Sequence, residues 1–193
     1  MEASKKMVPL EEAMEQVRTV GIRLALMHLA YARTLVQEHG MEKGRDLIIK
    51  AMMAYGKLVG ERKKPGRQDL PWYGFHDKYV YKDKNFVDTR EQPTDDFDYA
   101  FYKVYGCILA KTFLEYDEPE LGSLYCYVDP AKSMTADPAC KLIHTACEVC
   151  GDDFCAFDSV ATTEEDRSRF KAQDPAWKAT DPILIRKKDG VDE

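Results

Sequence analysis

The first 62 residues carry an apolar pattern with helical spacing. From position 10 to position 35 the pattern advances in alternating steps of four and three residues, which makes one stripe along a helix. The members of this stripe are Leu10, Met14, Val17, Gly21, Leu24, His28, Tyr31 and Leu35. Gly40 predicts the end of the helix. A second helix is predicted from about Glu42 to Val59, with its buried face formed by Leu47, Ile48, Ala51, Met52, Tyr55 and Leu58.

Two helices joined at a single glycine predict an antiparallel helical hairpin. Its stripes need a further layer to cover them, which the second half of the chain must provide. His28 lies on the first stripe, where we expect a packed, hydrogen-bonded core histidine. Because the stripe is heptad-like, it also allows a homo-oligomer through the N-terminal helices.

Residues 63–96 are rich in proline, glycine and charge, and they contain an aromatic cluster of Trp72, Tyr73, Phe75 and Tyr79. A loop this long in a compact domain is usually functional or mobile. Two interpretations remain open: a lid over a pocket, with His76 facing a ligand, or an irregular cover whose aromatic side chains pack on the helices.

Strand and turn patterns dominate the second half. Alternating residues from Phe97 predict a strand that continues to Tyr105 and stops at Gly106. A helical run from Cys107 follows, and then a short helix that opens at Pro119 and is closed by Asp129 and Pro130.

Two extended segments, 141–149 and 154–160, flank Gly151 and predict a β-hairpin. Residues 163–193 are interpreted as one short helix and a loosely held charged tail. The chain is therefore predicted to be a single α+β domain over residues 1–193, with an N-terminal helical hairpin packed on a small antiparallel sheet that ends in a β-hairpin.

Charge and composition narrow the function classes. The 28 Lys and Arg residues and 34 Asp and Glu residues give a net charge of −6, and no basic run appears that could neutralise a series of phosphates, so nucleic acid is not an expected partner. The acidic first 20 residues do not resemble a signal peptide, and no apolar run approaches a membrane span. We therefore expect a cytoplasmic protein without a membrane partner, whose six cysteines are thiols, metal ligands or catalytic groups.

All six cysteines fall between positions 107 and 155. Cys107 lies where a strand turns into a helix, a position that can lower a thiol pKa, although a small packed residue is the plainer explanation. Cys126 and Asp129 are three positions apart and share a helical face. His144, in the middle of a strand, could act as a base for a thiol or a water, or could simply pair across the sheet.

The spacing of the later cysteines raises the possibility of a metal site. Cys140, Cys147, Cys150 and Cys155 could together hold zinc, or iron. Against this, alternate strand residues face opposite sides of a sheet, and no histidine follows at knuckle spacing. No cofactor is therefore expected.

The ordered string of motifs resembles the L-2-amino-thiazoline-4-carboxylic acid hydrolase family. The resemblance is carried by Gly106-Cys107-Ile108-Leu109-Ala110, Pro119-Glu120-Leu121-Gly122, Cys126, Asp129-Pro130, His144-Thr145 and Gly151-Asp152-Asp153-Phe154-Cys155-Ala156-Phe157. It implies hydrolytic opening of a C–N bond in a small cyclic amidine or a related sulfur and nitrogen heterocycle.

The resemblance also suggests roles for particular residues. It gives Cys107, Cys126 and Asp129 as catalytic candidates, to which His144 is added from its position in the strand. It gives Glu120, Gly122, Gly151 and Cys155 as substrate-binding candidates, to which His76 is added from the aromatic segment. Either a cysteine attacks the amidine carbon or Asp129 and His144 activate a water. The family commonly has an Arg-Thr pair where this chain has His144-Thr145, so its substrate is expected to differ from the family's namesake.

A shorter similarity, to 4-vinyl reductase type domains, rests on the cysteine and glycine pattern of the hairpin. It keeps a second hypothesis open, in which the chain is a cysteine-lined module that binds a small molecule or a metal, as a sensor does, without turnover.

Overall fold

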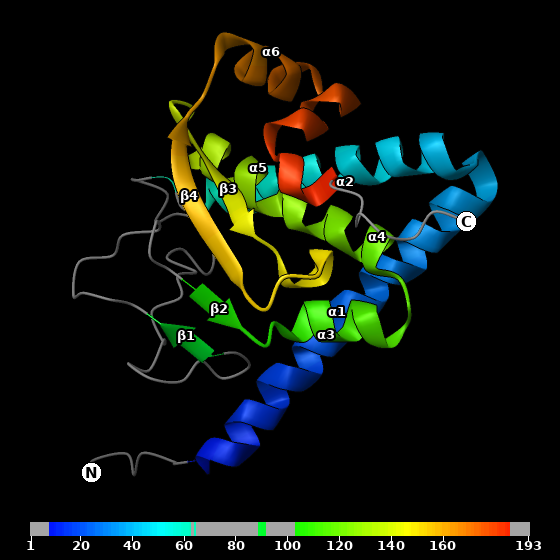
Figure 1. Ribbon diagram of the computed structural model, residues 1–193, viewed down its shortest axis with the longest axis vertical. Helices are drawn as coiled ribbons and strands as arrows, with labels where there is room; N and C mark the ends of the chain where they lie inside the picture. Colours follow the sequence, from blue (N-terminus) through cyan, green and yellow to red (C-terminus); the bar gives the residue numbers. More distant parts are fainter. Residues whose placement is uncertain (1–7, 63, 65–88, 92–102, 186–193) are drawn as a thin grey trace, which may run out of the picture.

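The computed structural model describes residues 8–62, 64, 89–91 and 103–185 (Figure 1). Its helices are α1 (Leu10–His39), α2 (Met41–Glu61), α3 (Ile108–Glu115), α4 (Pro119–Ser123), α5 (Val128–Ala136) and α6 (Glu164–Ala172). Short 3₁₀ helices are η2 (Leu124–Tyr127), η3 (Glu148–Cys150), η4 (Pro175–Thr180) and η5 (Pro182–Ile185). The strands are β1 (Thr89–Glu91), β2 (Lys103–Tyr105), β3 (Cys140–Ala146) and β4 (Cys155–Ala161). The aromatic cluster, His76 and positions 97–102 of the predicted strand lie outside the described residues.

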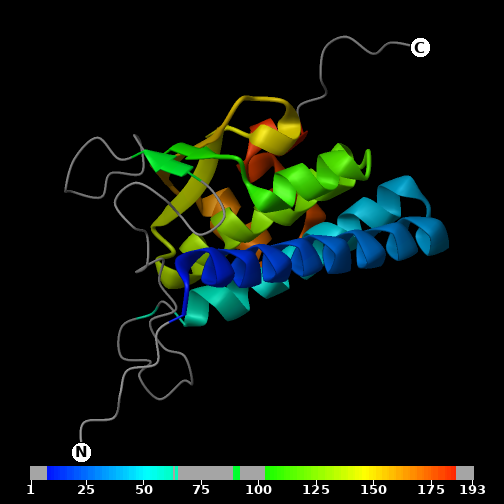
Figure 2. The same cartoon turned by 90° about the horizontal axis from the view of Figure 1, so that it is seen from below.

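The predicted helical hairpin is confirmed. Gly40 separates α1 from α2 and has a φ of 79°, a conformation that glycine adopts without a steric penalty. The two helices run side by side along one side of the molecule, as Figure 2 shows. At Gly44 a Cβ atom would lie 2.7 Å from the Cα of Val36, so the start of α2 approaches α1 too closely for a side chain.

The predicted buried faces of these helices were wrong in part. In α1 the buried residues are Ala25, His28, Leu29 and Ala32, and in α2 they are Gly44, Ile48, Ile49, Met53, Gly56 and Gly60. Tyr31 and Leu58, both assigned to the core by periodicity, are 68% and 70% exposed. The real faces are rich in alanine and glycine because small side chains allow neighbouring helices to approach closely, a preference that hydrophobicity alone does not reveal.

The α5 helix connects the helical hairpin to the sheet. It packs against α2 on one side and β3 on the other (Figure 1). The approach to α2 is close, since a Cβ atom added at Gly56 would lie 2.3 Å from the Cβ of Ala131. The position of α5 therefore depends on the absence of a side chain at Gly56.

The sheet is antiparallel with strand order β1-β2-β4-β3, and the predicted α+β class is confirmed. The predicted β-hairpin is formed by β3 and β4, with His144 opposite Phe157 and an irregularity between His144 and Ala146. The connection differs from the prediction because Glu148–Cys150 forms the 3₁₀ helix η3. Gly151, with a φ of 102°, ends η3 and turns the chain toward β4.

The sequence predicted that Asp129 and Pro130 close a helix, and this prediction was wrong. They lie in the first turn of α5, which continues to Ala136. Proline is tolerated there because the first backbone N–H groups of a helix have no intrahelical acceptor. Asp129 is also favourable in this turn, since the N-terminus of a helix attracts negative charge.

The segment after α6 is not a loosely held tail. Trp177 and Leu184 are buried, and the rings of Tyr127 and Phe170 contact the Trp177 indole. The Tyr127 hydroxyl also donates a hydrogen bond of 2.9 Å to the carbonyl oxygen of Lys178. The segment 175–185 is thus anchored to the core by Trp177 and Leu184, and residues 186–193 of the predicted tail lie outside the described part.

Candidate functional site

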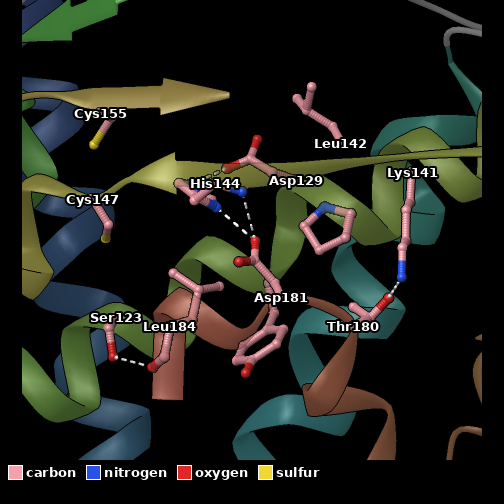
Figure 3. Close-up of polar contacts among 12 residues, drawn as sticks. Ser123, Asp129, Lys141, Leu142, His144, Cys147, Cys155, Thr180, Asp181 and Leu184 are labelled. Carbon is pink, nitrogen blue, oxygen red and sulfur yellow. Dashed lines mark hydrogen bonds and ion pairs between the residues drawn. The ribbon is translucent and has the colours of Figure 1, made fainter. Parts of the chain in front are cut away.

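Two carboxylates flank the buried imidazole of His144 (Figure 3). On one side, His144 Nδ1 lies 2.7 Å from Asp181 Oδ2. On the other side, His144 Nε2 lies 3.6 Å from Asp129 Oδ2. We call these three residues the Asp-His-Asp cluster; they come from α5, β3 and the junction between η4 and η5.

The edge position of β3 explains how the cluster assembles. β3 is the last strand of the sheet, so the backbone N–H groups on its outer side need other acceptors. Ser133 of α5 supplies one, since its Oγ accepts a hydrogen bond of 2.7 Å from Leu142 N–H. Asp181 supplies the next, because its Oδ2 accepts from His144 N–H at 3.1 Å and also contacts the ring. One carboxylate therefore completes the strand edge and orients the histidine.

The surroundings of His144 favour its protonated form. Burial alone would lower its pKa, but the hydrogen bond to Asp181 and the charges of Asp129 and Asp181 outweigh this and raise the pKa to about 9. His144 is therefore a cation at neutral pH. It thus carries a positive charge where the resemblance suggested an arginine. Its side chain is only 1% exposed, and its two ring nitrogens face the carboxylates of Asp129 and Asp181 rather than a substrate.

Asp129 is the member of the cluster that reaches the surface. Its side chain is 17% exposed, whereas that of Asp181 is 0% exposed. Asp129 Oδ1 also forms an ion pair with Lys132, one turn further along α5. Two cations, His144 and Lys132, thus face the Asp129 carboxylate. Asp181 contacts the other nitrogen of the His144 ring.

Four cysteines converge next to this cluster. Cys147 is fully buried, and its sulfur accepts a hydrogen bond of 2.8 Å from Cys150 Sγ. Cys126 and Cys155 lie beside Cys147, which contributes to the raised pKa of both. Figure 3 shows Cys147 and Cys155 on the side of His144 that faces away from Lys141 and Thr180. We call this group of four the thiol cluster.

Three thiols of this region, those of Cys107, Cys126 and Cys155, have a raised pKa. The hydrogen bond to Cys147 and burial raise the pKa of Cys126 and of Cys155 well above the usual range. Burial likewise raises the pKa of Cys107 to about 12, which outweighs the lowering by the backbone amides of α3. Cys107 caps α3, and its N–H donates to Glu148 Oε2 at 2.9 Å. The location that could have activated Cys107 does not lower its pKa.

Cys140 lies apart from the other cysteines. It pairs with Ala161 at the opposite end of the hairpin from Cys155, and its thiol contacts Asp137. The four cysteines that the spacing suggested as metal ligands therefore do not come together. Within the described residues, no three histidine, cysteine or acidic side chains are arranged to hold a metal ion.

Three further candidates have structural explanations. Glu120 is largely exposed and forms an ion pair with Arg45 of α2. Gly122 lies against Phe113, where a Cβ atom would come within 2.4 Å of the ring. Gly151 provides the left-handed turn after η3.

His28 is a core histidine, as predicted. Its Nε2 lies 2.8 Å from the carbonyl oxygen of Leu121, and burial lowers its pKa. His28 therefore has a structural role, between α1 and α4.

Asp181 was missed because its segment was interpreted as a charged tail. A signal was present in the sequence: Trp177 and the apolar run Ile183-Leu184-Ile185 follow one another closely, and such residues need a core to cover them. Recognising this would have assigned the segment to the core. The partner of Asp181 could not have been inferred, since His144 lies 37 positions earlier.

The fold and the site define an α+β protein with a buried histidine held between two carboxylates, beside a cluster of cysteine side chains. The chain belongs to the L-2-amino-thiazoline-4-carboxylic acid hydrolase family, whose sequence pattern matches residues 21–158. This range includes Asp129 and His144 but ends before Asp181. Neither the comparison with curated proteins nor that with solved structures gave a match. No helix in the described part is both long and apolar enough to cross a lipid bilayer.

Proposed function

We propose that this protein hydrolyses a small cyclic amidine, or a related sulfur and nitrogen heterocycle, by opening a C–N bond of the ring. Membership of the hydrolase family supports the reaction class. The observation that carries the proposal is the Asp-His-Asp cluster, in which a partly exposed carboxylate is backed by a buried imidazolium.

In the proposed mechanism Asp129 activates a water molecule. The carboxylate accepts the proton of the water while the oxygen forms a bond to the amidine carbon. The C–N bond of the ring then breaks while the new hydroxyl oxygen becomes a carbonyl oxygen. Asp129 passes its proton to the departing nitrogen, and the hydroxyl proton moves to the amidine nitrogen that still lacks one, so that a carbonyl product and an amine form. His144 and Asp181 are positioning residues in this scheme: the imidazolium holds the Asp129 carboxylate, and Asp181 keeps the imidazole protonated and oriented.

The raised thiol pKa values favour water over cysteine as the nucleophile. A thiolate is the reactive form of cysteine, and Cys107 and Cys126 both have a pKa far above neutral. Protonated His144 also has no capacity to accept a thiol proton at neutral pH. The reaction needs no metal or cofactor, because a carboxylate and a water supply the acid–base chemistry.

The proposal includes a small-molecule substrate and a cytoplasmic location. All six cysteines are unpaired, which fits a reducing compartment. His144 faces Asp129 and Asp181 from a buried position, so recognition of a substrate carboxylate is assigned to other residues than His144.

The test is turnover of a panel of cyclic amidines that includes 2-aminothiazoline-4-carboxylate. New amine and new thiol groups are measured separately, because opening a C–N bond releases an amine and opening a C–S bond releases a thiol. Asp129→Asn is expected to lower kcat by roughly 10²-fold or more, the usual contribution of a general base. Cys107→Ala and Cys126→Ala are expected to retain turnover. Asp153→Asn, an exposed turn residue, is the control with the same loss of charge.

A cysteine-lined binding module without turnover is the alternative, and the convergence of four cysteine side chains favours it. Calorimetry with the same panel separates the two functions. If calorimetry detects binding and no product forms, the protein is a binding module and not a hydrolase. Loss of turnover in Cys126→Ala, with Asp129→Asn still active, would replace the water mechanism by a thiol mechanism.

A further inference from the structure

We propose that Cys147 and Cys150 form a reversible disulfide, so that the thiol cluster contains a redox couple that reacts with small disulfides. The inference is separate from the proposed hydrolysis, because it concerns the state of the two sulfurs and requires no turnover. It rests on the geometry of η3, on the unequal burial of the two thiols and on the contacts that hold the turn.

The 3₁₀ geometry aligns the two side chains. Cys147 immediately precedes η3 and Cys150 is its last residue, and Cys150 N–H donates to the Cys147 carbonyl oxygen at 2.9 Å. This hydrogen bond closes the turn and brings the two ends of the segment 147–150 together, so the two sulfurs are in contact. Their separation of 2.8 Å leaves a short movement to a disulfide bond of about 2.05 Å.

The turn is held in this conformation by groups around it. Asp152 Oδ2 accepts a hydrogen bond of 2.7 Å from Cys147 N–H, and Gly151 adopts the left-handed conformation that ends η3. Glu148 N–H donates to Cys155 Sγ at 3.3 Å, which ties the turn to β4. Since the reduced form already fixes the backbone, forming the bond requires little further ordering of the chain.

The two thiols differ in access. Cys147 is fully buried, whereas Cys150 is partly exposed. A reagent therefore meets Cys150 first, and Cys147 is the resolving thiol. This division of roles matches the usual arrangement of redox-active pairs, in which an accessible cysteine lies next to a resolving one.

The exchange with a small disulfide such as oxidised glutathione is balanced. Cys150 loses its proton to solvent, and its sulfur attacks one glutathione sulfur. A mixed disulfide forms, and the released glutathione thiolate takes up a proton. Cys147 then loses its proton, and its sulfur attacks the Cys150 sulfur, which releases the second glutathione. Two protein thiols give up two electrons and two protons, and the oxidant becomes two thiols.

Oxidation would change the contacts beside the Asp-His-Asp cluster. In the reduced protein the Cys147 thiol lies beside Cys126 and Cys155. A sulfur in a disulfide carries no S–H and can no longer donate to either neighbour. Cys126 lies three positions before Asp129, so the couple is placed where its state can be communicated to that carboxylate.

The test is a thiol count by mass spectrometry after alkylation of the full chain. Reduced protein is incubated with oxidised glutathione and compared with untreated protein. Wild type is expected to lose two of its six alkylation sites, both in the peptide that contains Cys147 and Cys150, and to regain them with dithiothreitol. Cys147→Ser is expected to accumulate a stable glutathione adduct on Cys150, and Cys150→Ser to lose the reaction. Cys140→Ser, a cysteine variant at the far end of the hairpin, is expected to behave as wild type.

Three results would overturn the proposal. All six thiols could remain alkylatable at every glutathione ratio, or the oxidised pair could map to Cys126 or Cys155. The purified protein could also contain a stoichiometric zinc or iron ion, released by thiol-blocking reagents, that shields these cysteines. If a serine variant does not fold, the peptide mapping of wild type still decides the question.

Discussion

Asp181→Asn tests whether His144 is charged in the folded protein. The pKa of His144 rises from about 6.5 to about 9, and each pKa unit corresponds to about 1.36 kcal/mol, so the charged interactions stabilise the fold by about 3 kcal/mol. A group with a raised pKa in the folded state contributes fully below its unfolded pKa, and the contribution disappears as the pH rises through about 9. The variant removes the contribution of Asp181 and keeps that of Asp129, so it is expected to lose up to about 3 kcal/mol more at pH 6 than at pH 10.

A second contribution does not depend on pH. The asparagine amide would place N–H donors where Asp181 Oδ1 has no hydrogen-bond partner among the described atoms, and an unsatisfied buried donor costs about 1–3 kcal/mol. The free energy of unfolding should be measured by urea titration at pH 6 and pH 10, with Asp153→Asn as the control. NMR titration of the His144 ring reports the pKa directly. An equal loss of stability at both pH values, or a His144 midpoint below 7, would refute the reasoning.

Two other predictions concern stability. Gly56→Ala should lower the free energy of unfolding by about 1–3 kcal/mol, because the added methyl group would overlap Ala131 and force α2 and α5 apart. Its thermal midpoint should therefore fall, and an unchanged midpoint would show that the helices separate without cost. Asp166→Asn should destabilise the protein by about 1–2 kcal/mol at pH 7: although burial raises the pKa of Asp166, hydrogen bonds from Thr163 and Lys141 hold it at about 2. This stabilisation is present above the unfolded pKa and is lost as the pH falls toward 2. Urea titrations should therefore show a smaller difference in the free energy of unfolding between variant and wild type at pH 3 than at pH 7. An equal difference at both pH values would contradict the prediction.

Local patterns were sufficient to predict the N-terminal helical hairpin and the β-hairpin of this chain. The spacing of apolar residues indicated α1 and α2, and Gly40 marked the end of α1. The two extended segments on either side of Gly151 indicated the hairpin of β3 and β4, although η3 replaced the last residues of the predicted strand. These predictions depend on residues within a few positions of one another, which is the range over which helix and strand periods act.

The faces of the helices were harder to predict. Tyr31 and Leu58 satisfy the helical period but are exposed, while Gly44 and Gly56 are buried against neighbouring helices. Periodicity ranks positions by hydrophobicity, whereas packing selects the positions where two backbones can approach. The buried face of α2 therefore depends on its contact with α5. The sequence did not predict α5, because it was interpreted as ending a helix at Asp129.

The site itself combines both kinds of information. By itself, the sequence determined the types of elements, the motifs of the hydrolase family and the candidates Asp129 and His144. Only the tertiary structure decided that Asp181 completes the edge of β3, that His144 carries a charge and that Cys147 contacts three other thiols. The reason is physical: the pKa and contacts of a buried group depend on charges and donors brought close by folding, and their distance in space is not encoded by their separation along the chain.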